Sequence, residues 1–222
     1  MISSPWLLLL VGAVGASATM ALLWAVSVRI GNASYVDVAW ALGIAATPVA
    51  YALLADGSTL PRVLVAGLGT VWGVRLGTYL LARLAGKEED GRYQELRRRW
   101  APNANRAFFV FFQAQAFFVL AFSLPFALVA SDRGGTSSLT WVGAAIAAGS
   151  IVGEVTADTQ LAVWKGNPEN RGRTARLGLW GWSRHPNYFF EWLHWVGWAI
   201  VALASPPGWP ALLVPVFLLY LL

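Results

Sequence analysis

Seven long runs of apolar residues, in which charged side chains are rare, limit the possible folds of this chain more than any other feature. Inside a bilayer every backbone N–H and C=O group needs a partner within the protein, so only helices and closed barrels can span it. The runs are continuous and do not alternate between apolar and polar residues, which favours helices. We therefore predict an all-α, polytopic bundle of about seven transmembrane helices, each needing about 20 residues. The predicted spans are residues 5–28, 35–54, 62–84, 107–130, 139–164, 187–204 and 209–222, in a single domain over residues 1–222.

The first and last runs need separate interpretation. Residues 5–28 lack the basic start of a signal peptide and exceed its usual apolar length, so they are predicted to form a true span. Residues 209–222 are shorter than the about 20 residues of a full span. We therefore expect the last span to be cut short and a native C-terminal segment to be absent.

Composition supports a membrane protein and excludes several kinds of site. Of the 222 residues, 57% are hydrophobic and 12% are charged, and the charged fraction of soluble domains is about twice as high. Without cysteine the chain has no disulfide, iron–sulfur cluster or thiolate metal site. The net charge of +5 comes from arginines in short loops, as is usual in membrane proteins, so it does not indicate a nucleic-acid partner.

The distribution of basic residues predicts the orientation in the membrane. The loop after the third run holds six basic residues and the loop after the fifth holds five, whereas the opposite loops hold only Arg62 and Arg133. Loops rich in Lys and Arg stay in the cytoplasm. We therefore expect an integral protein of the bacterial inner membrane, with its N-terminus outside and its cofactor site on the cytoplasmic side.

Besides Arg62 and Arg83 near the ends of the third span, five charged residues fall within the predicted spans, where a charge is costly unless it is paired or hydrated. They are Asp37, Arg75, Glu154, Asp158 and Glu191. Glu154 and Asp158 are four residues apart and share a helix face, which Lys165 continues, while Asn187 and Glu191 share a face of the sixth span. We expect these residues to meet at a functional polar cavity open to the cytoplasm. A structural network of ion pairs, with Arg75 bound to Asp37, is the alternative.

The motifs that most often hold metals and nucleotides are missing. Glu191 and His194 form a single Glu-x-x-His pair, and the chain has only two histidines, so no metal site is expected. No glycine-rich phosphate loop is present, so a nucleotide would have to be bound by side chains. The segment Arg-His-Pro-Asn-Tyr at residues 184–188 suits this role, because its proline favours a helix start, where anions bind.

Residues 178–192 carry a longer pattern, Gly-Leu-Trp-Gly-Trp-Ser-Arg-His-Pro-Asn-Tyr-Phe-Phe-Glu-Trp. This run resembles the signature of the steroid 5α-reductase superfamily. It is most similar to the bacterial branch of uncharacterised membrane proteins, a domain of unknown function grouped with the C-terminal domain of 3-oxo-5α-steroid 4-dehydrogenase. Residues 35–40, 72–76 and 86–93, and Asp158 ahead of Lys165, also resemble that branch.

The resemblance implies a seven-helix bundle that binds NADPH from the cytoplasmic side and transfers a hydride to a polarised carbon–carbon double bond. The substrate would be lipophilic, either steroid-like, enone-like or isoprenoid-like. The implied cofactor-binding residues match either nucleotide-contacting positions of the steroid reductases or a motif of the sterol reductases. The first group is Asp158, Lys165, Asn187 and Glu191, joined by Glu154 on the helix face of Asp158, and the second group is Arg184, His185 and Tyr188.

The resemblance also implies a catalytic pair. Steroid reductases use a glutamate and a tyrosine to polarise the substrate ketone, and Asp37 stands in for the glutamate. The tyrosine position, three residues before Arg75, is Trp72 here, so Tyr35 or Tyr79 would supply the hydroxyl. The predicted catalytic residues are therefore Asp37, Tyr35, Tyr79 and Arg75. In that family a C-terminal cytoplasmic segment helps to close over the cofactor, and we expect this segment to be absent here.

Two other functions remain open. Membrane methyltransferases that act on isoprenylated cysteine or phospholipid share a similar Arg-His-Pro-x-Tyr run and bind S-adenosylmethionine. Asn187 before Tyr188 and the spacing to Glu191 favour the reductases. The third function is that of a non-enzymatic lipid-binding protein with a vestigial site. In every case the expected partners are a lipophilic small molecule and membrane lipids.

Overall fold

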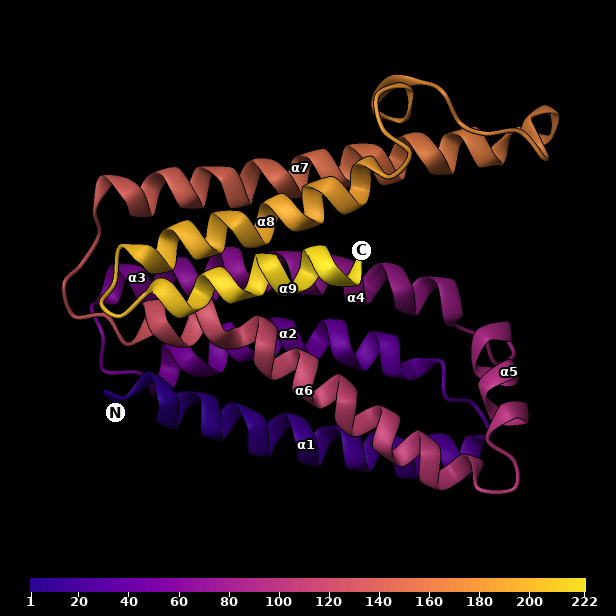
Figure 1. The fold of residues 1–222 in the computed structure, drawn as a ribbon, viewed down its shortest axis with the longest axis horizontal. Coiled ribbons are helices and arrows are strands. Elements are labelled where there is room, and N and C mark those ends of the chain that lie inside the picture. Colours follow the sequence, from indigo (N-terminus) through magenta and orange to yellow (C-terminus); the bar gives the residue numbers. More distant parts are fainter. The chain divides into compact units, whose positions relative to one another are not determined.

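The fold is built from α-helices joined by loops (Figure 1). The computed structural model describes all 222 residues, of which 79% are helical, and it contains no strand. The prediction of an all-α fold is confirmed. The chain divides into two compact units, Met1–Gly135 and Thr136–Leu222. The prediction of a single domain stays a prediction.

The N-terminal unit holds the helices α1 to α6. Their bounds are α1 (Pro5–Ile30), α2 (Tyr35–Leu54), α3 (Thr59–Leu64), α4 (Thr70–Leu84), α5 (Gly91–Arg99) and α6 (Ala104–Ala130). A π-helical segment, Val65–Gly69, joins α3 to α4. Helix α1 begins where the Ser4 side chain accepts a hydrogen bond from the backbone of Leu7. It ends at Gly31, whose positive φ of 68° is a conformation that glycine adopts readily.

Small residues let α2 and α4 pack closely. A Cβ on Gly73 would lie 2.8 Å from the carbonyl oxygen of Ala41, and one on Gly77 would lie 2.6 Å from the side chain of Leu42. Trp72 on α4 is fully buried, while α6 packs against both α1 and α2. These contacts form part of the core of the unit.

The C-terminal unit pairs two long helices. Its elements are α7 (Ser138–Gly166), the 3₁₀ turns η2 (Pro168–Asn170) and η3 (Gly178–Gly181), α8 (Pro186–Leu203), the 3₁₀ turn η4 (Trp209–Leu212) and α9 (Leu213–Leu221). Helices α7 and α8 approach closely at Gly143 and Gly197, where added Cβ atoms would lie 2.6 and 2.7 Å from the facing backbone. Buried His194 accepts a hydrogen bond from Trp198 at Nε2, and its Nδ1 lies 3.1 Å from the carbonyl oxygen of Ala147. The ring therefore carries its proton on Nδ1, and both nitrogens serve the helix packing.

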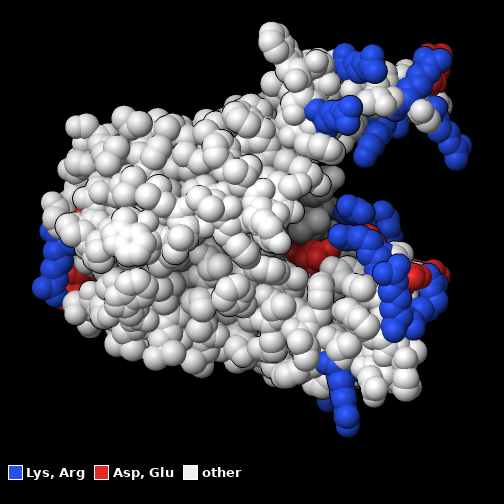
Figure 2. Space-filling view, viewed as in Figure 1, with Lys and Arg blue, Asp and Glu red and all other residues white.

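Five helices are long and apolar enough to cross a membrane. They are Pro5–Ile30, Tyr35–Leu54, Thr59–Leu84, Ala104–Ala130 and Ser138–Gly166, and they contain the first five predicted spans. Figure 2 shows that the charged side chains on the visible face gather toward the helix ends, whereas the broad flanks carry none. Uncharged flanks of this kind suit contact with lipid.

The last two predicted spans do not belong to this group. Residues 187–204 correspond to α8, which has 18 residues but includes Asn187, Glu191 and His194, and these lower its hydropathy. Residues 209–222 form η4 and α9, which together make a shorter apolar helix. By length and composition the chain therefore has five candidate spans, and the crossing of the membrane by the last two stays a prediction.

Candidate functional site

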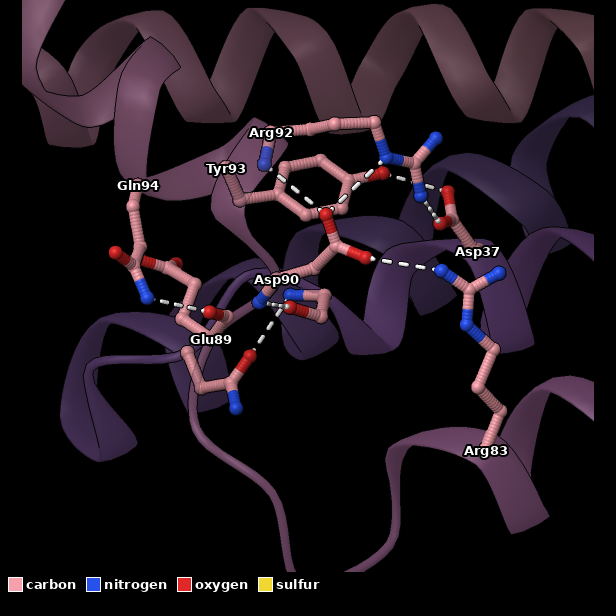
Figure 3. A network of polar contacts seen from close by, with 9 residues as sticks. Asp37, Arg83, Glu89, Asp90, Arg92, Tyr93 and Gln94 are labelled. Atoms are coloured by element: carbon pink, nitrogen blue, oxygen red, sulfur yellow. Dashed lines mark hydrogen bonds and ion pairs between the residues drawn. The ribbon is translucent and has the colours of Figure 1, made fainter. Parts of the chain in front are cut away.

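A group of polar side chains, which we call the Asp37 network, joins the start of α2 to α5 (Figure 3). Asp37, in the first turn of α2, accepts a hydrogen bond from the hydroxyl of Tyr93 at 2.6 Å and another from Arg92 at 3.1 Å. The Tyr93 side chain is buried, and its ring packs edge-on against that of Phe111. Burial and the neighbouring Asp37 carboxylate both raise the pKa of Tyr93, so its hydroxyl remains a proton donor at neutral pH.

Glu89 forms a buried ion pair in the same network. Its two carboxylate oxygens accept hydrogen bonds from Arg97 at 2.7 and 3.0 Å, and one of them also accepts from the backbone N–H of Ala33 at 2.8 Å. Only 8% of the Glu89 side chain is exposed. Burial alone would raise the pKa of Glu89, but the hydrogen bonds from Arg97 and Ala33 outweigh burial and lower the pKa below its usual value. Through its hydrogen bonds with Arg97 of α5 and with Ala33, Glu89 holds α5 against the loop that precedes α2.

Asp90 completes the network as the N-cap of α5. Its side chain accepts a hydrogen bond from the backbone N–H of Arg92 at 3.0 Å, and its own N–H donates to the hydroxyl of Ser34 at 2.8 Å. Arg83 lies 3.4 Å from its other carboxylate oxygen. The hydrogen bond from the Arg92 backbone is the main cause that lowers the pKa of Asp90. These contacts fasten the segment before α5 to the start of α2.

The structure places the four predicted catalytic residues in different surroundings. Asp37 lies in the network, Arg75 is half-buried on α4, and Tyr79 on α4 is exposed over 55% of its surface. Tyr35 is two residues before Asp37, and about 100° of rotation per residue puts the two on nearly opposite faces of α2. The hydroxyl that contacts Asp37 belongs to Tyr93. From the sequence we assigned no role to Tyr93, although it lies in residues 86–93, which resemble the bacterial branch of the superfamily. The catalytic roles of Tyr35, Tyr79 and Arg75 stay predictions.

An apolar pocket of about 570 Å³ lies between α1 and α2. Val119 of α6 also lines it. Of the predicted catalytic residues, Tyr35 belongs to this lining and Asp37 does not. The N-terminal unit thus has an apolar space on one face of α2 and a polar network on the other.

The C-terminal unit has a larger and more polar pocket at the start of α8. Its volume is about 890 Å³, and its lining includes five of the predicted cofactor-binding residues, Lys165, Arg184, His185, Asn187 and Tyr188. The rings of His185 and Tyr188 stack with their centroids 5.1 Å apart. The side-chain oxygen of Asn187 is buried and has no hydrogen-bond partner. The pocket therefore offers cations and a flat aromatic surface to a ligand, and the buried Asn187 oxygen beside it lacks a hydrogen-bond donor.

The loop between α7 and α8, which forms part of this pocket, is fixed against α7. The side chain of Gln160 accepts a hydrogen bond from the backbone N–H of Leu179 at 2.9 Å, and Trp180 donates to the carbonyl oxygen of Ala157 at 2.8 Å. Gly178 has a φ of 50°, and a Cβ there would lie 2.6 Å from the Gln160 side chain, so the turn requires glycine. This wall of the pocket is therefore held in place without a ligand.

A further pocket of about 480 Å³ adjoins the polar pocket at the start of α8. The two pockets share Leu161, Lys165 and Ala175, and the second adds Arg171 and Arg173. A long ligand placed across both would have Lys165 near its middle.

Three predicted cofactor-binding residues lie outside these linings. Glu154 on α7 is buried, and Asp158 on α7 and Glu191 on α8 are half-buried. Their roles in binding a cofactor stay predictions. No group of three or more His, Cys, Asp or Glu side chains is placed to hold a metal ion.

Long apolar helices with polar clusters at their ends define a helical membrane protein, and the C-terminal unit adds a basic pocket to it. The chain belongs to the DUF1295 family, described as a protein of unknown function, which matches residues 23–222. This confirms the predicted membership of a family of uncharacterised proteins, whereas the relationship to steroid 5α-reductases stays a prediction. No curated protein and no solved structure is significantly similar to the chain.

Proposed function

We propose that this protein is a membrane-embedded reductase that uses NADPH to reduce a carbon–carbon double bond in a lipophilic substrate. The observation that carries the proposal is the charge around the two adjoining pockets of the C-terminal unit. Five basic side chains line them, Lys165, Arg171, Arg173, Arg176 and Arg184. NADPH carries a pyrophosphate and a 2′-phosphate, and guanidinium groups bind phosphate through paired, charge-assisted hydrogen bonds.

The other lining groups also suit parts of this cofactor. The N-terminus of α8 favours a phosphate oxygen. The stacked rings of His185 and Tyr188 would support the nicotinamide or adenine ring. The Asn187 oxygen would accept a hydrogen bond from an amide or amino group of the ligand, and leaving it buried without one costs about 1–3 kcal/mol. NADPH, when bound, supplies the hydride.

Reduction of an enone places negative charge on the oxygen of the acceptor, and this charge needs a hydrogen-bond donor in a dry site. Asp37 is the candidate for this role, with Tyr93 as its hydroxyl partner. In the Asp37 network both carboxylate oxygens of Asp37 accept hydrogen bonds. Asp37 would therefore have to exchange one partner for the substrate and take up a proton from water before it could act as an acid. Arg92, whose side chain is 65% exposed, is the partner that can leave more easily.

The charge of the pockets weighs against both alternative functions. S-adenosylmethionine has no phosphate and carries a positive sulfonium centre, so surrounding cations would repel that centre. A lipid chain would leave the Asn187 oxygen without a donor. S-adenosylmethionine offers the arginines only one carboxylate, whereas NADPH offers them a pyrophosphate and a 2′-phosphate.

Cofactor binding to the purified full-length protein tests the proposal. NADPH at a hundred times its dissociation constant should raise the free energy of unfolding by about 2.7 kcal/mol, whereas S-adenosylmethionine should have no effect. Arg184→Gln should weaken NADPH binding by about tenfold to a hundredfold, because a lost hydrogen bond to a charged group costs about 1.5–3 kcal/mol. Asn187→Ala should also weaken it, and Arg106→Gln, an exposed arginine on α6, is the control. Stabilisation by S-adenosylmethionine alone would show that the proposal is wrong.

A further inference from the structure

The apolar pocket of the N-terminal unit is a slot between two helices that follow each other in the chain. It leaves a volume of about 570 Å³ between α1 and α2. Small residues form much of its lining, among them Gly12, Gly15, Ala16, Ala39, Gly43 and Ala46. A Cβ on Gly15 would meet no atom within 4 Å. The slot is thus an open space whose walls are too small to fill it.

The slot is long and narrow. Its lining on α2 runs from Tyr35 to Tyr51, a length of about 24 Å at 1.5 Å per residue. An α-helix with its side chains is about 10–12 Å across, so over this length it would occupy more than three times the volume of the slot, and a helix from a second copy of the chain does not fit inside. A single extended hydrocarbon chain does fit.

Four hydroxyl side chains line the slot, those of Thr19, Tyr35, Thr47 and Tyr51, and the last two have hydrogen-bond partners within the protein. Thr47 donates to a backbone carbonyl of its own helix at 3.0 Å, and Tyr51 shares a hydrogen bond of 3.0 Å with Ser123. Tyr51 also closes one end, because a Cβ on Gly12 would overlap its hydroxyl. Tyr35 lies at the other end, at the first residue of α2. The walls between the two tyrosines therefore favour an apolar occupant.

We propose that this slot binds one linear hydrocarbon chain, acyl or isoprenoid, as the tail of the substrate. The inference rests on the proposed function and narrows the lipophilic substrate to a linear lipid in place of a fused-ring steroid. Both helices around the slot are candidate membrane spans, and a bilayer supplies chains of this kind. Tyr35 and Asp37 lie in the first turn of α2 on nearly opposite faces, so a head group that leaves the slot at Tyr35 would pass around the start of this helix to reach the Asp37 network. There the exposed Arg92 complements a carbonyl or carboxylate head group.

Photoaffinity labelling tests this inference. Full-length protein in phosphatidylcholine nanodiscs is irradiated with palmitate, geranylgeraniol or cholesterol that carries a diazirine, and the labelled peptides are mapped by mass spectrometry. The two linear probes should label residues of α1 and α2 that line the slot, and the ratio of their labelling distinguishes an acyl from an isoprenoid chain. Ala46→Leu, which places a larger side chain in the slot, should reduce this labelling by about tenfold. Ala18→Leu, at an exposed alanine of α1 outside the lining, should leave it unchanged.

Two results would overturn the inference. One is stronger labelling of the slot by the cholesterol probe than by the linear probes, and the other is labelling by the linear probes that Ala46→Leu does not reduce. A parallel titration with NADPH separates this inference from the proposed function. NADPH binding without labelling of the slot refutes only the slot, and labelling of the slot without NADPH binding refutes only the reductase.

Discussion

Glu89→Gln is the substitution that tests the Asp37 network most sharply. It keeps the size and shape of the side chain but removes the negative charge that Arg97 contacts at 2.7 Å. The glutamine amide has one oxygen and one NH₂ group, whereas both oxygens of Glu89 accept hydrogen bonds. Whichever way the amide turns, its NH₂ group therefore faces a donor of Arg97, and in one of the two orientations it also faces the backbone N–H of Ala33.

The expected loss in the free energy of unfolding is about 1.5–3 kcal/mol, the value of a hydrogen bond to a charged group. Breaking a fully buried ion pair costs about 3–5 kcal/mol, and this is the upper limit here, because 33% of the Arg97 side chain is exposed and can turn to water. For a protein of 222 residues each kcal/mol should lower the Tm by about 2–4 °C. Thermal unfolding of the purified protein measures this shift.

The dependence on pH gives an independent check. The folded pKa of Glu89 lies below its ordinary value of 4.5, so its contribution to stability is complete above that value and is lost as the pH falls through the folded pKa. The difference in Tm between the wild type and Glu89→Gln should therefore be constant near neutral pH and shrink in acid. Glu88→Gln, at the exposed neighbouring residue, removes the same charge and should change stability by less than about 0.5 kcal/mol. Equal effects of the two substitutions, or a difference that grows in acid, would refute the reasoning.

Three further predictions concern the network, the reaction and the orientation. Tyr93→Phe keeps the ring packing but removes one donor to Asp37, so it should cost about 1.5–3 kcal/mol in thermal unfolding, whereas the exposed Tyr79→Phe should cost nothing measurable. Asp37→Asn should abolish turnover of an identified substrate and leave NADPH affinity unchanged, and a matching loss of affinity in a binding titration would contradict its assignment. Cysteines placed at Glu88 and Asn170 should resist impermeant thiol reagents in intact cells, and labelling of either would overturn the predicted cytoplasmic position of these loops.

The helices could be predicted because long apolar runs leave the backbone few alternatives in lipid. Their ends were harder to predict, since they depend on capping and not on hydropathy. The third span was predicted to begin at residue 62, but the helix begins at Thr59, because Pro61 is compatible with a first helical turn. The sixth and seventh runs are helical as well, but neither belongs to the group of long apolar helices. The sixth run contains polar residues, and the seventh is too short.

The two candidate sites differ in how far the sequence reveals them. Four of the predicted residues that line the pocket at α8 lie within residues 184–188, so the local pattern predicted their proximity. Tyr93 and Asp37 are 56 residues apart, and they meet only because α5 folds back onto the start of α2. The pairing of Glu89 with the backbone of Ala33 has the same origin, again across 56 residues. Such contacts depend on tertiary packing. The only hint in the sequence was that residues 86–93, which include Tyr93, resemble the bacterial branch of the superfamily.

Transfer of hydrogen from NADPH to a lipid is the central claim, and isotopic labelling tests it most directly. Vesicles that contain the full-length protein and extracted membrane lipids would receive either NADPH deuterated at C4 of the nicotinamide ring or S-adenosylmethionine with a deuterated methyl group. Mass spectrometry of the lipids should find deuterium from NADPH in a new C–H bond, in a yield that Arg184→Gln reduces and Arg106→Gln does not. Deuterium that arrives only from the methyl donor, with none from NADPH, would contradict the account.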